Sequence, residues 1–434
     1  MGLIEVAGYY RHLQDGFRNL GIPALFFQPG VHRFQYQKKP NALCRHLGAT
    51  HTLYDSLKKR RHKFVRNVLK LYLGLWQCIL FAWAALSFDV FIFSYRTSFD
   101  GALTGIRKYR DLAILKALRK TIIYVYHGSD ARPPYLSGHY QDDAPEKLLR
   151  RTQEMLREVA VVERYADAIV NHPPTSQFHN RPVIQWLNVG IPFDAPKDVA
   201  ASEGDKSENV VRILHAPSAQ KAKGTSEVRR AISVLKDEGL PIDYVELIDV
   251  PNHKVLEMLQ TADLLVDEIY SDTLMAGLSS EAAFYGVPTI VCGLELDRLK
   301  AIVPAQTAPP AMTGLPDDLV DNIRTMIVDL EKRKSIGIAA QDFVRREWNP
   351  TVVAKRFLRI IQGDIPADWF YDSASDLPFT GGWGMPQSTR SKVLQNYINT
   401  LGPQALGWEG KPLLIDALQE SIKETTPQSS EMTV

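Results

Sequence analysis

A short segment between a predicted strand and a predicted helix carries the residue types that bind phosphate. The segment reads HAPSAQKAKGT, from His215 to Thr225, and contains Lys221 and Lys223 near the start of the helix. Backbone N–H groups and the helix dipole at such a turn attract anions, and the lysines add charge compensation, with Lys223 the strongest candidate. The same residues also fit a surface loop with solvated lysines, and the segment alone does not decide between the two.

A second segment predicts a site for a ribose. It reads DEIYSDTLMAGLSSEAAFYGVPTIV, from Asp267 to Val291, and gives a strand end, a loop of small residues with Gly277, and a helix carrying Glu281. Gly277 allows the backbone to approach a ligand closely, and the Glu281 carboxylate can accept two hydrogen bonds from a diol. The alternative, favoured for an isolated glutamate, is that Glu281 only stabilises the helix dipole.

A third polar segment follows a predicted strand in the first half of the chain. It reads VYHGSDARPPY, from Val125 to Tyr135, and includes His127, Asp130 and Arg132. Ligands of open parallel sheets bind at the carboxyl ends of the strands. An isolated histidine is usually structural, but His-Gly-Ser-Asp at this edge favours a role in a site.

Strands alternating with helices in both halves of the chain predict that these segments lie on parallel sheets. In the first half we expect helices at Tyr9–Leu20 and Pro145–Ala166, and strands at Ala24–Gln28 (weaker), Phe88–Ser94, Thr121–Tyr126, Ala168–Asn171 and Val183–Leu187. In the second half we expect strands at Val210–His215, Asp243–Asp249, Asp263–Glu268 and Pro288–Cys292. The expected helices there are Thr225–Glu238, His253–Ala262, Leu278–Tyr285, Asp317–Glu331, Ser335–Glu347 and Thr351–Gln362.

The length of 434 residues and the two sets of elements predict two domains. Residues 194–208 combine small, charged and proline residues without periodicity, which is typical of a linker. We therefore expect an N-terminal domain over 1–193 with a short or missing first strand, a C-terminal domain over 209–350, a segment over 351–415 that crosses back onto the N-terminal domain, and a disordered tail over 416–434.

Residues 71–88 form an apolar run long enough to span a bilayer, and seven basic residues lie between 58 and 70. Gln77 interrupts the run and a predicted strand follows it at once, which favours a buried or interfacial helix over a true span. The basic cluster is either a solvated helix end or part of a peripheral contact with anionic membrane through residues 58–88.

Composition excludes several classes of protein. Hydrophobic residues at 45% and charged residues at 23% argue against a disordered, collagen-like or polytopic membrane protein. The formal net charge of +2 says little about partners, because a nucleic-acid binder usually shows a large basic excess on one domain or stripe. Cys44, Cys78 and Cys292 are widely spaced and predict reduced core thiols without a metal site. With no secretory signal apparent, we expect a cytoplasmic location, with the inner face of the membrane as an alternative.

The two segments of the second half resemble the C-terminal domain of glycosyltransferase family 4, the retaining GT-B enzymes. In that family a Lys-Gly pair opens the first helix and contacts the donor diphosphate, which here corresponds to Lys223 and Gly224. The family also has two glutamates separated by seven residues. The second glutamate is followed by Ala and then by a Gly-x-Pro strand entry, and Glu281 matches this second glutamate. The first glutamate is replaced by Thr273, with Asp272 one residue out of register.

The resemblance implies an α/β GT-B fold, in which two Rossmann-like parallel-sheet domains face each other across a cleft. The first half resembles the acceptor domain more weakly, so that His127 and Asp130 are the implied catalytic residues and Arg132 and Tyr135 lie on the acceptor side. An arginine usual in the family is Ser218 here. The implied donor-binding residues are Gly8, Ser218, Lys223, Gly224, Thr225, Asp267, Thr273, Gly277, Leu278, Ser279 and Glu281.

The activity implied by the resemblance is retaining transfer of a sugar from a UDP- or GDP-sugar to a hydroxyl of a glycan, polysaccharide or lipid-linked precursor. No cofactor, metal or nucleic-acid partner is implied. Because of Thr273 and Ser218, two alternatives stay open: a catalytically silent GT-B subunit that binds a nucleotide or supports a partner enzyme, and a sugar-nucleotide epimerase.

Overall fold

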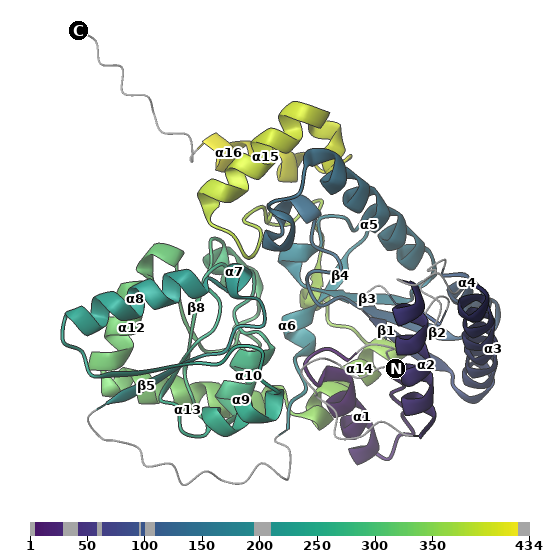
Figure 1. Ribbon diagram of the computed structural model, residues 1–434, viewed down its shortest axis with the longest axis horizontal. Coiled ribbons are helices and arrows are strands. Elements are labelled where there is room, and N and C mark those ends of the chain that lie inside the picture. Colours follow the sequence, from purple (N-terminus) through teal and green to yellow (C-terminus); the bar gives the residue numbers. More distant parts are fainter. Residues whose placement is uncertain are drawn as a thin grey trace.

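The computed structural model describes residues 5–28, 42–58, 63–94, 97–99, 109–194 and 210–423. The chain forms two separate five-stranded sheets, each flanked by helices, and a C-terminal segment that returns to the first sheet (Figure 1). The predicted α/β architecture of two Rossmann-like sheet domains facing across a cleft is confirmed.

The N-terminal sheet has the strand order β1-β2-β3-β4-β10. Its strands are β1 (Val90–Ser94), β2 (Thr121–Val125), β3 (Ala168–Asn171), β4 (Val183–Gln185) and β10 (Phe370–Tyr371). The first four are parallel, and β10 pairs with β4 in the antiparallel direction. These strands are almost entirely buried, as expected for parallel strands covered on both faces.

The helices of this half are α1 (Tyr9–Asn19), α2 (Ala42–Lys58), α3 (Lys63–Ser87), α4 (Arg110–Ala117), α5 (Pro145–Tyr165) and α6 (Trp186–Val189). Helix α5 begins with a proline, which needs no hydrogen-bond partner in the first turn. Its buried residues Leu148, Met155, Val159 and Val162 recur at helical spacing and form the face that packs against the core.

The C-terminal sheet is parallel throughout, with the order β6-β5-β7-β8-β9. Its strands are β5 (Val211–His215), β6 (Ile242–Glu246), β7 (Leu264–Val266), β8 (Thr289–Cys292) and β9 (Met312–Gly314). Its helices are α7 (Gln220–Lys223), α8 (Thr225–Asp237), α9 (Asn252–Leu259), α10 (Gly277–Phe284), α11 (Leu296–Ile302), α12 (Leu319–Val328) and α13 (Leu330–Glu347). Ile213 packs into one apolar cluster and Leu214 into another, because successive strand residues point to opposite faces.

The chain then crosses back through α14 (Pro350–Gln362), β10, α15 (Gln387–Leu401) and α16 (Pro412–Lys423). Helix α14 packs along α1, and α15 packs on α5, so that these helices lie on the N-terminal half in Figure 1. The crossing of α1 and α14 is close because residue 16 is glycine, and a Cβ there would stand 1.9 Å from the Pro350 carbonyl oxygen.

Several predicted elements are wrong or incomplete. Residues 24–28 form no strand, because they pair with no other described strand and their apolar side chains instead line a cavity between α1, α3 and β1. The strand predicted to reach Leu187 ends at Gln185, where α6 begins. The tail predicted over 416–434 is helical as far as Lys423, since Leu418 is buried, and the rest lies outside the described residues. Cys78 is exposed, against the prediction of a core thiol.

Other predictions fall partly outside the described residues. Nearly all of the predicted linker over 194–208 does so, as does the side chain of Cys44. In the described part before α1, residues 5–8 form a turn rather than a strand. The predicted helix within 58–88 is confirmed as α3, and β1 follows it after two residues.

Candidate active site between the domains

Two adjoining cavities lie between the domains, at the carboxyl ends of the strands. The larger, of about 310 Å³, is lined by both domains, and the smaller, of about 200 Å³, mainly by the C-terminal domain. They share the wall residues Ala7, Ser218, Lys223, Ala276 and Gly277. A ligand with two chemically different ends can therefore occupy both cavities at once, with its middle part beside Lys223.

Lys223 is held at this junction by two acidic side chains. Its Nζ lies 3.0 Å from an oxygen of Asp267 and also contacts Glu268, both at the end of β7. Burial alone would lower the pKa of Lys223, but the two carboxylates outweigh it and hold the pKa above its usual value. Burial would likewise raise the pKa of Glu268, yet Lys223 and donated hydrogen bonds keep it low. Lys223 is therefore a permanent cation in the cavity wall.

The far end of the smaller cavity contains Glu281 and Asn252. The Asn252 amide donates to both carboxylate oxygens of Glu281, at 3.0 and 3.3 Å. Burial raises the pKa of Glu281 to about 8, with a smaller contribution from the charge of Asp267. Burial destabilises the ionised form of this carboxyl group, and a ligand that donates hydrogen bonds to the carboxylate would stabilise it.

The first turn of α10 lines both cavities. Ala276 and Gly277 reach both, and Leu278 reaches the smaller one. A Cβ on Gly277 would stand 3.1 Å from the Cβ of Ala7, so that the turn before α1 faces the start of α10 across the cleft. Gly224 and Thr225 at the start of α8 line neither cavity, so the helix start beside the cavities is that of α10, whose first N–H groups have no partner within the helix.

His127 forms part of the N-terminal wall of the larger cavity. Its Nε2 lies 2.8 Å from the hydroxyl of Tyr10, and its ring packs edge-on against Tyr9. Burial lowers the pKa of His127 to about 3, so the imidazole is neutral at physiological pH. The Tyr10 contact fixes the ring, which leaves a neutral hydrogen-bonding group at the cavity wall.

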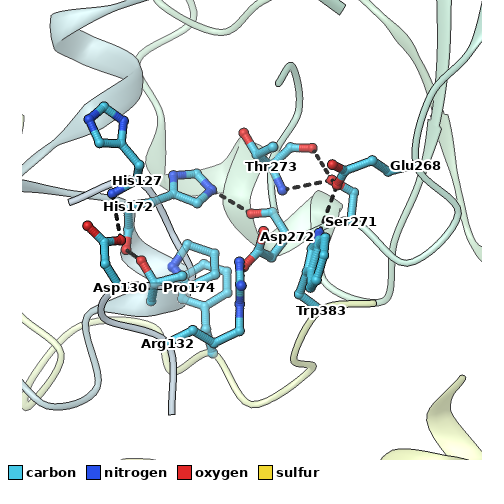
Figure 2. Close-up of polar contacts among 12 residues, drawn as sticks. His127, Asp130, Arg132, His172, Pro174, Glu268, Ser271, Asp272, Thr273 and Trp383 are labelled. Carbon is cyan, nitrogen blue, oxygen red and sulfur yellow. Dashed lines mark hydrogen bonds and ion pairs between the residues drawn. The ribbon is translucent and has the colours of Figure 1, made fainter. Parts of the chain in front are cut away.

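Arg132 links the domains across the same cavity. Its Nε donates to a carboxylate oxygen of Asp272 at 2.9 Å, and both side chains are buried. His172, at the end of β3, contacts the Asp272 carbonyl, and Trp383 lies under the Arg132 guanidinium at 4.9 Å. Figure 2 shows this cluster, with Trp383 also donating to Glu268 at 2.9 Å. The side chain and the carbonyl of Asp272 are thus both engaged in contacts that join the two domains.

Several predicted site residues do not line either cavity. Asp130 accepts a 2.8 Å hydrogen bond from the backbone N–H of His127 and therefore shapes the loop from behind (Figure 2). Tyr135 is wrong as an acceptor-side residue: it is fully buried, donates to the Leu406 carbonyl at 2.6 Å and stacks on Tyr397 in the packing of the C-terminal segment.

The remaining predicted residues divide in the same way. Ser218, Lys223, Thr273, Gly277, Leu278, Glu281, His127 and Arg132 line a cavity. Gly8, Gly224, Thr225, Asp267 and Ser279 lie behind the wall. Among these, Asp267 accepts from Ser279 at 2.6 Å, and Thr225 bonds His215 at 3.0 Å. Gly224 has φ +72°, and a Cβ there would meet the Cβ of Ile269 at 2.6 Å.

Sequence reasoning missed several residues of the wall. Glu268, Asn252, His172, Trp186 and Trp383 were not among the predicted site residues. A signal existed for Glu268 and His172, because Glu268 is the last residue of a predicted parallel strand and His172 directly follows another. Trp383 lies more than 100 residues from its partner Glu268, and no local pattern indicates the pairing.

The described residues contain no group of three or more His, Cys, Asp or Glu side chains that could hold a metal ion. No protein-family model matches the sequence, and no curated protein matches it.

Solved structures resemble the fold at low identity. Sucrose-phosphate synthase from Thermosynechococcus elongatus is 13% identical with a TM-score of 0.49, over 83% of this chain and 98% of that chain. Anabaena HepE in complex with UDP and glucose is 14% identical with a TM-score of 0.39, over 73% and 96%. Spinosyn forosaminyltransferase SpnP is 12% identical with a TM-score of 0.35, over 66% and 79%. At these scores the chemistry of the site has to carry any functional conclusion.

Proposed function

We propose that the chain transfers a sugar from a nucleoside-diphosphate sugar to a hydroxyl acceptor, with retention of configuration, in the cleft between the domains. The observation that carries the proposal is the position of Lys223. It lies where the two cavities join, with Glu281 at the end of one and His127 and Arg132 in the wall of the other. A diphosphate between a nucleoside and a sugar needs a cation at this point.

The smaller cavity suits the nucleoside. A ribose diol that donates both hydroxyl hydrogens to Glu281 would satisfy the buried carboxylate, while Asn252 fixes its orientation. Leu247, Val250 and Val255 supply apolar walls for a base.

The junction suits the diphosphate. An ammonium group has three hydrogens, and Asp267 and Glu268 use two of those on Lys223, which leaves one for a phosphate oxygen. The start of α10 offers backbone N–H groups beside it, where the helix dipole favours negative charge. These groups would stabilise the diphosphate as the bond to the sugar breaks.

The larger cavity supports a retaining rather than an inverting course. An inverting transfer needs a free base that removes the acceptor proton. The described wall residues include two carboxylates, Glu268 and Asp272, and each is bound to a cation. The wall histidines are His127, His139 and His172, and burial lowers the pKa of each, which makes each a weaker base. The departing phosphate would then be the base that takes the proton of the acceptor hydroxyl. The acceptor would therefore attack the sugar on the same face from which the diphosphate leaves. Neutral His127 would hold a sugar hydroxyl beside it.

The test is turnover with a panel of UDP- and GDP-sugars, with product configuration read by NMR. Because Lys223→Ala would leave two buried carboxylates without their cation, the informative variants are Asn252→Ala and Glu281→Gln, with Asn180→Ala on the surface as the matched control. We expect both site variants to weaken nucleotide binding about tenfold or more. Unchanged turnover in both would refute the site.

Two other results would redirect the proposal. Nucleotide binding without transfer or donor hydrolysis would indicate a silent subunit. Conversion of the donor sugar without an acceptor would indicate an epimerase.

A further inference from the structure

Helix α3 carries a continuous stripe of exposed apolar side chains. These residues, the α3 stripe, recur every three or four positions and are Phe64, Val68, Leu71, Leu75, Ile79, Trp83 and Leu86. Phe64 is 81% exposed, Leu71 67% and Leu86 86%. At about 1.5 Å per residue the stripe is about 33 Å long. Scattered single apolar residues are normal on a surface, but a row of seven marks an interaction face.

The opposite face of α3 is packed against the protein. Leu73, Leu80, Ala84 and Ala85 are buried, and α2 lies along the helix. Only 22% of its most apolar window is buried, although α3 is long enough, and apolar enough at a mean hydropathy of 1.5, to cross a membrane. Helix α3 ends at Ser87, and β1 starts at Val90 inside the N-terminal sheet. The helix therefore cannot leave the domain to span a bilayer, but it can lie flat on one.

The charges of α3 indicate which surface covers the stripe. The helix contains no Asp or Glu, and its first two turns carry Lys63, Arg66 and Lys70. By helical spacing these cations lie on the side of α3 opposite the stripe. A helix with apolar residues on one face and Lys and Arg on the other is the pattern of helices that lie at the interface of anionic membranes.

An apolar cavity extends the same surface inward. It has a volume of about 390 Å³, lies between α3, α1 and β1, and shares Trp83 with the stripe. Figure 1 shows α3 at the outer edge of the N-terminal domain, remote from the C-terminal sheet. The face is thus separate from the cleft.

We propose that the N-terminal domain docks on an anionic lipid bilayer through the α3 stripe, with the helix in the plane of the interface. The inference does not depend on the proposed sugar transfer, since no stripe residue lines the cleft cavities.

The test is co-sedimentation of the full chain with vesicles of phosphatidylcholine alone or mixed with phosphatidylglycerol. The wild type is expected to bind the mixed vesicles, less so at high salt, and the pure ones weakly. Leu71→Glu with Leu75→Glu should reduce binding about tenfold or more. Val328→Glu with Ile338→Glu is the control, because these residues are 64% and 61% exposed on the other domain.

Light scattering completes the design. A wild type that stays in the supernatant, or a stripe variant that binds as tightly as the control, would overturn the proposal. A wild-type dimer that the stripe variant dissociates, without vesicle binding by either, would assign the stripe to a second copy instead. Because the substituted leucines are exposed, a folded variant is expected, and circular dichroism checks it.

Discussion

Replacing Glu281 by glutamine should stabilise the protein while weakening its affinity for nucleotides. Burial raises the pKa of Glu281 from its usual 4.5 to about 8. Between these values the unfolded chain has lost the proton and the folded chain keeps it, so the free energy of unfolding falls as pH rises. The loss is complete once the pH passes about 8. Glutamine does not titrate, so the free energy of unfolding of Glu281→Gln should not fall with pH in this way.

The size of the effect follows from the width of the pH window. Each pH unit within it is worth about 1.4 kcal/mol. Between pH 5 and pH 8 the stability gap between Glu281→Gln and the wild type should therefore widen by about 4 kcal/mol in favour of the variant. Below pH 4 the gap should be constant, because both states of the wild type are then protonated.

Urea unfolding of the full chain at a series of pH values measures the gap, without nucleotide present. Calorimetry on the same proteins measures binding: in the wild type, UDP or GDP affinity should rise with pH up to about 8, because the diol favours the ionised carboxylate. The variant should show no such rise. Stability curves that stay parallel from pH 5 to 8 would refute the argument that Glu281 is buried without a compensating charge.

Three further predictions concern the same cleft. Lys223→Met should lower the free energy of unfolding by about 3–5 kcal/mol because Asp267 and Glu268 lose their cation, and adding Glu268→Gln should recover part of the loss in urea unfolding; a neutral effect would contradict the buried cluster. Gly224→Ala should cost about 1–3 kcal/mol by thermal unfolding, whereas Gly239→Ala, also at positive φ but with open space around it, should cost about 1; equal losses would exclude the Ile269 contact as the cause. Since the pKa of His127 is about 3, the pH profile of turnover should show no titration of this residue between pH 5 and 8, and a shift of the acidic limb in His127→Gln would contradict its neutrality.

The sequence predicted the parts of the fold that depend on local patterns. The alternation from β5 to β8 was visible because β5, β7 and β8 are largely buried and apolar, and the helices between the strands have Gly or Pro at their ends. The strand β9 was missed, because three partly exposed residues carry no periodicity. Residues 24–28 looked like a strand by composition, but a strand needs a neighbour to receive its hydrogen bonds.

The candidate site shows the same division. Lys223 and Glu281 were predictable because each lies on a short helix that follows the carboxyl end of a parallel strand, where such sheets bind ligands. That Lys223 would be held by two acids required the packing of β5 beside β7. The Arg132–Asp272 ion pair joins residues 140 positions apart on different domains, and only the docking of the domains brings them together. A different contact buries Tyr135 away from the cleft: α15 of the C-terminal segment covers it, and Tyr135 stacks on Tyr397 there.

The return of the chain to the N-terminal sheet has a consequence for biosynthesis. Strand β10 completes that sheet beside β4, and α14 covers α1, yet both are made only after the entire C-terminal sheet. At about 5–20 residues per second, the ribosome needs tens of seconds or less to travel from β4 to β10. During that time β4 has an open edge and α1 an uncovered face. The second domain to be synthesised is therefore the first that can finish folding.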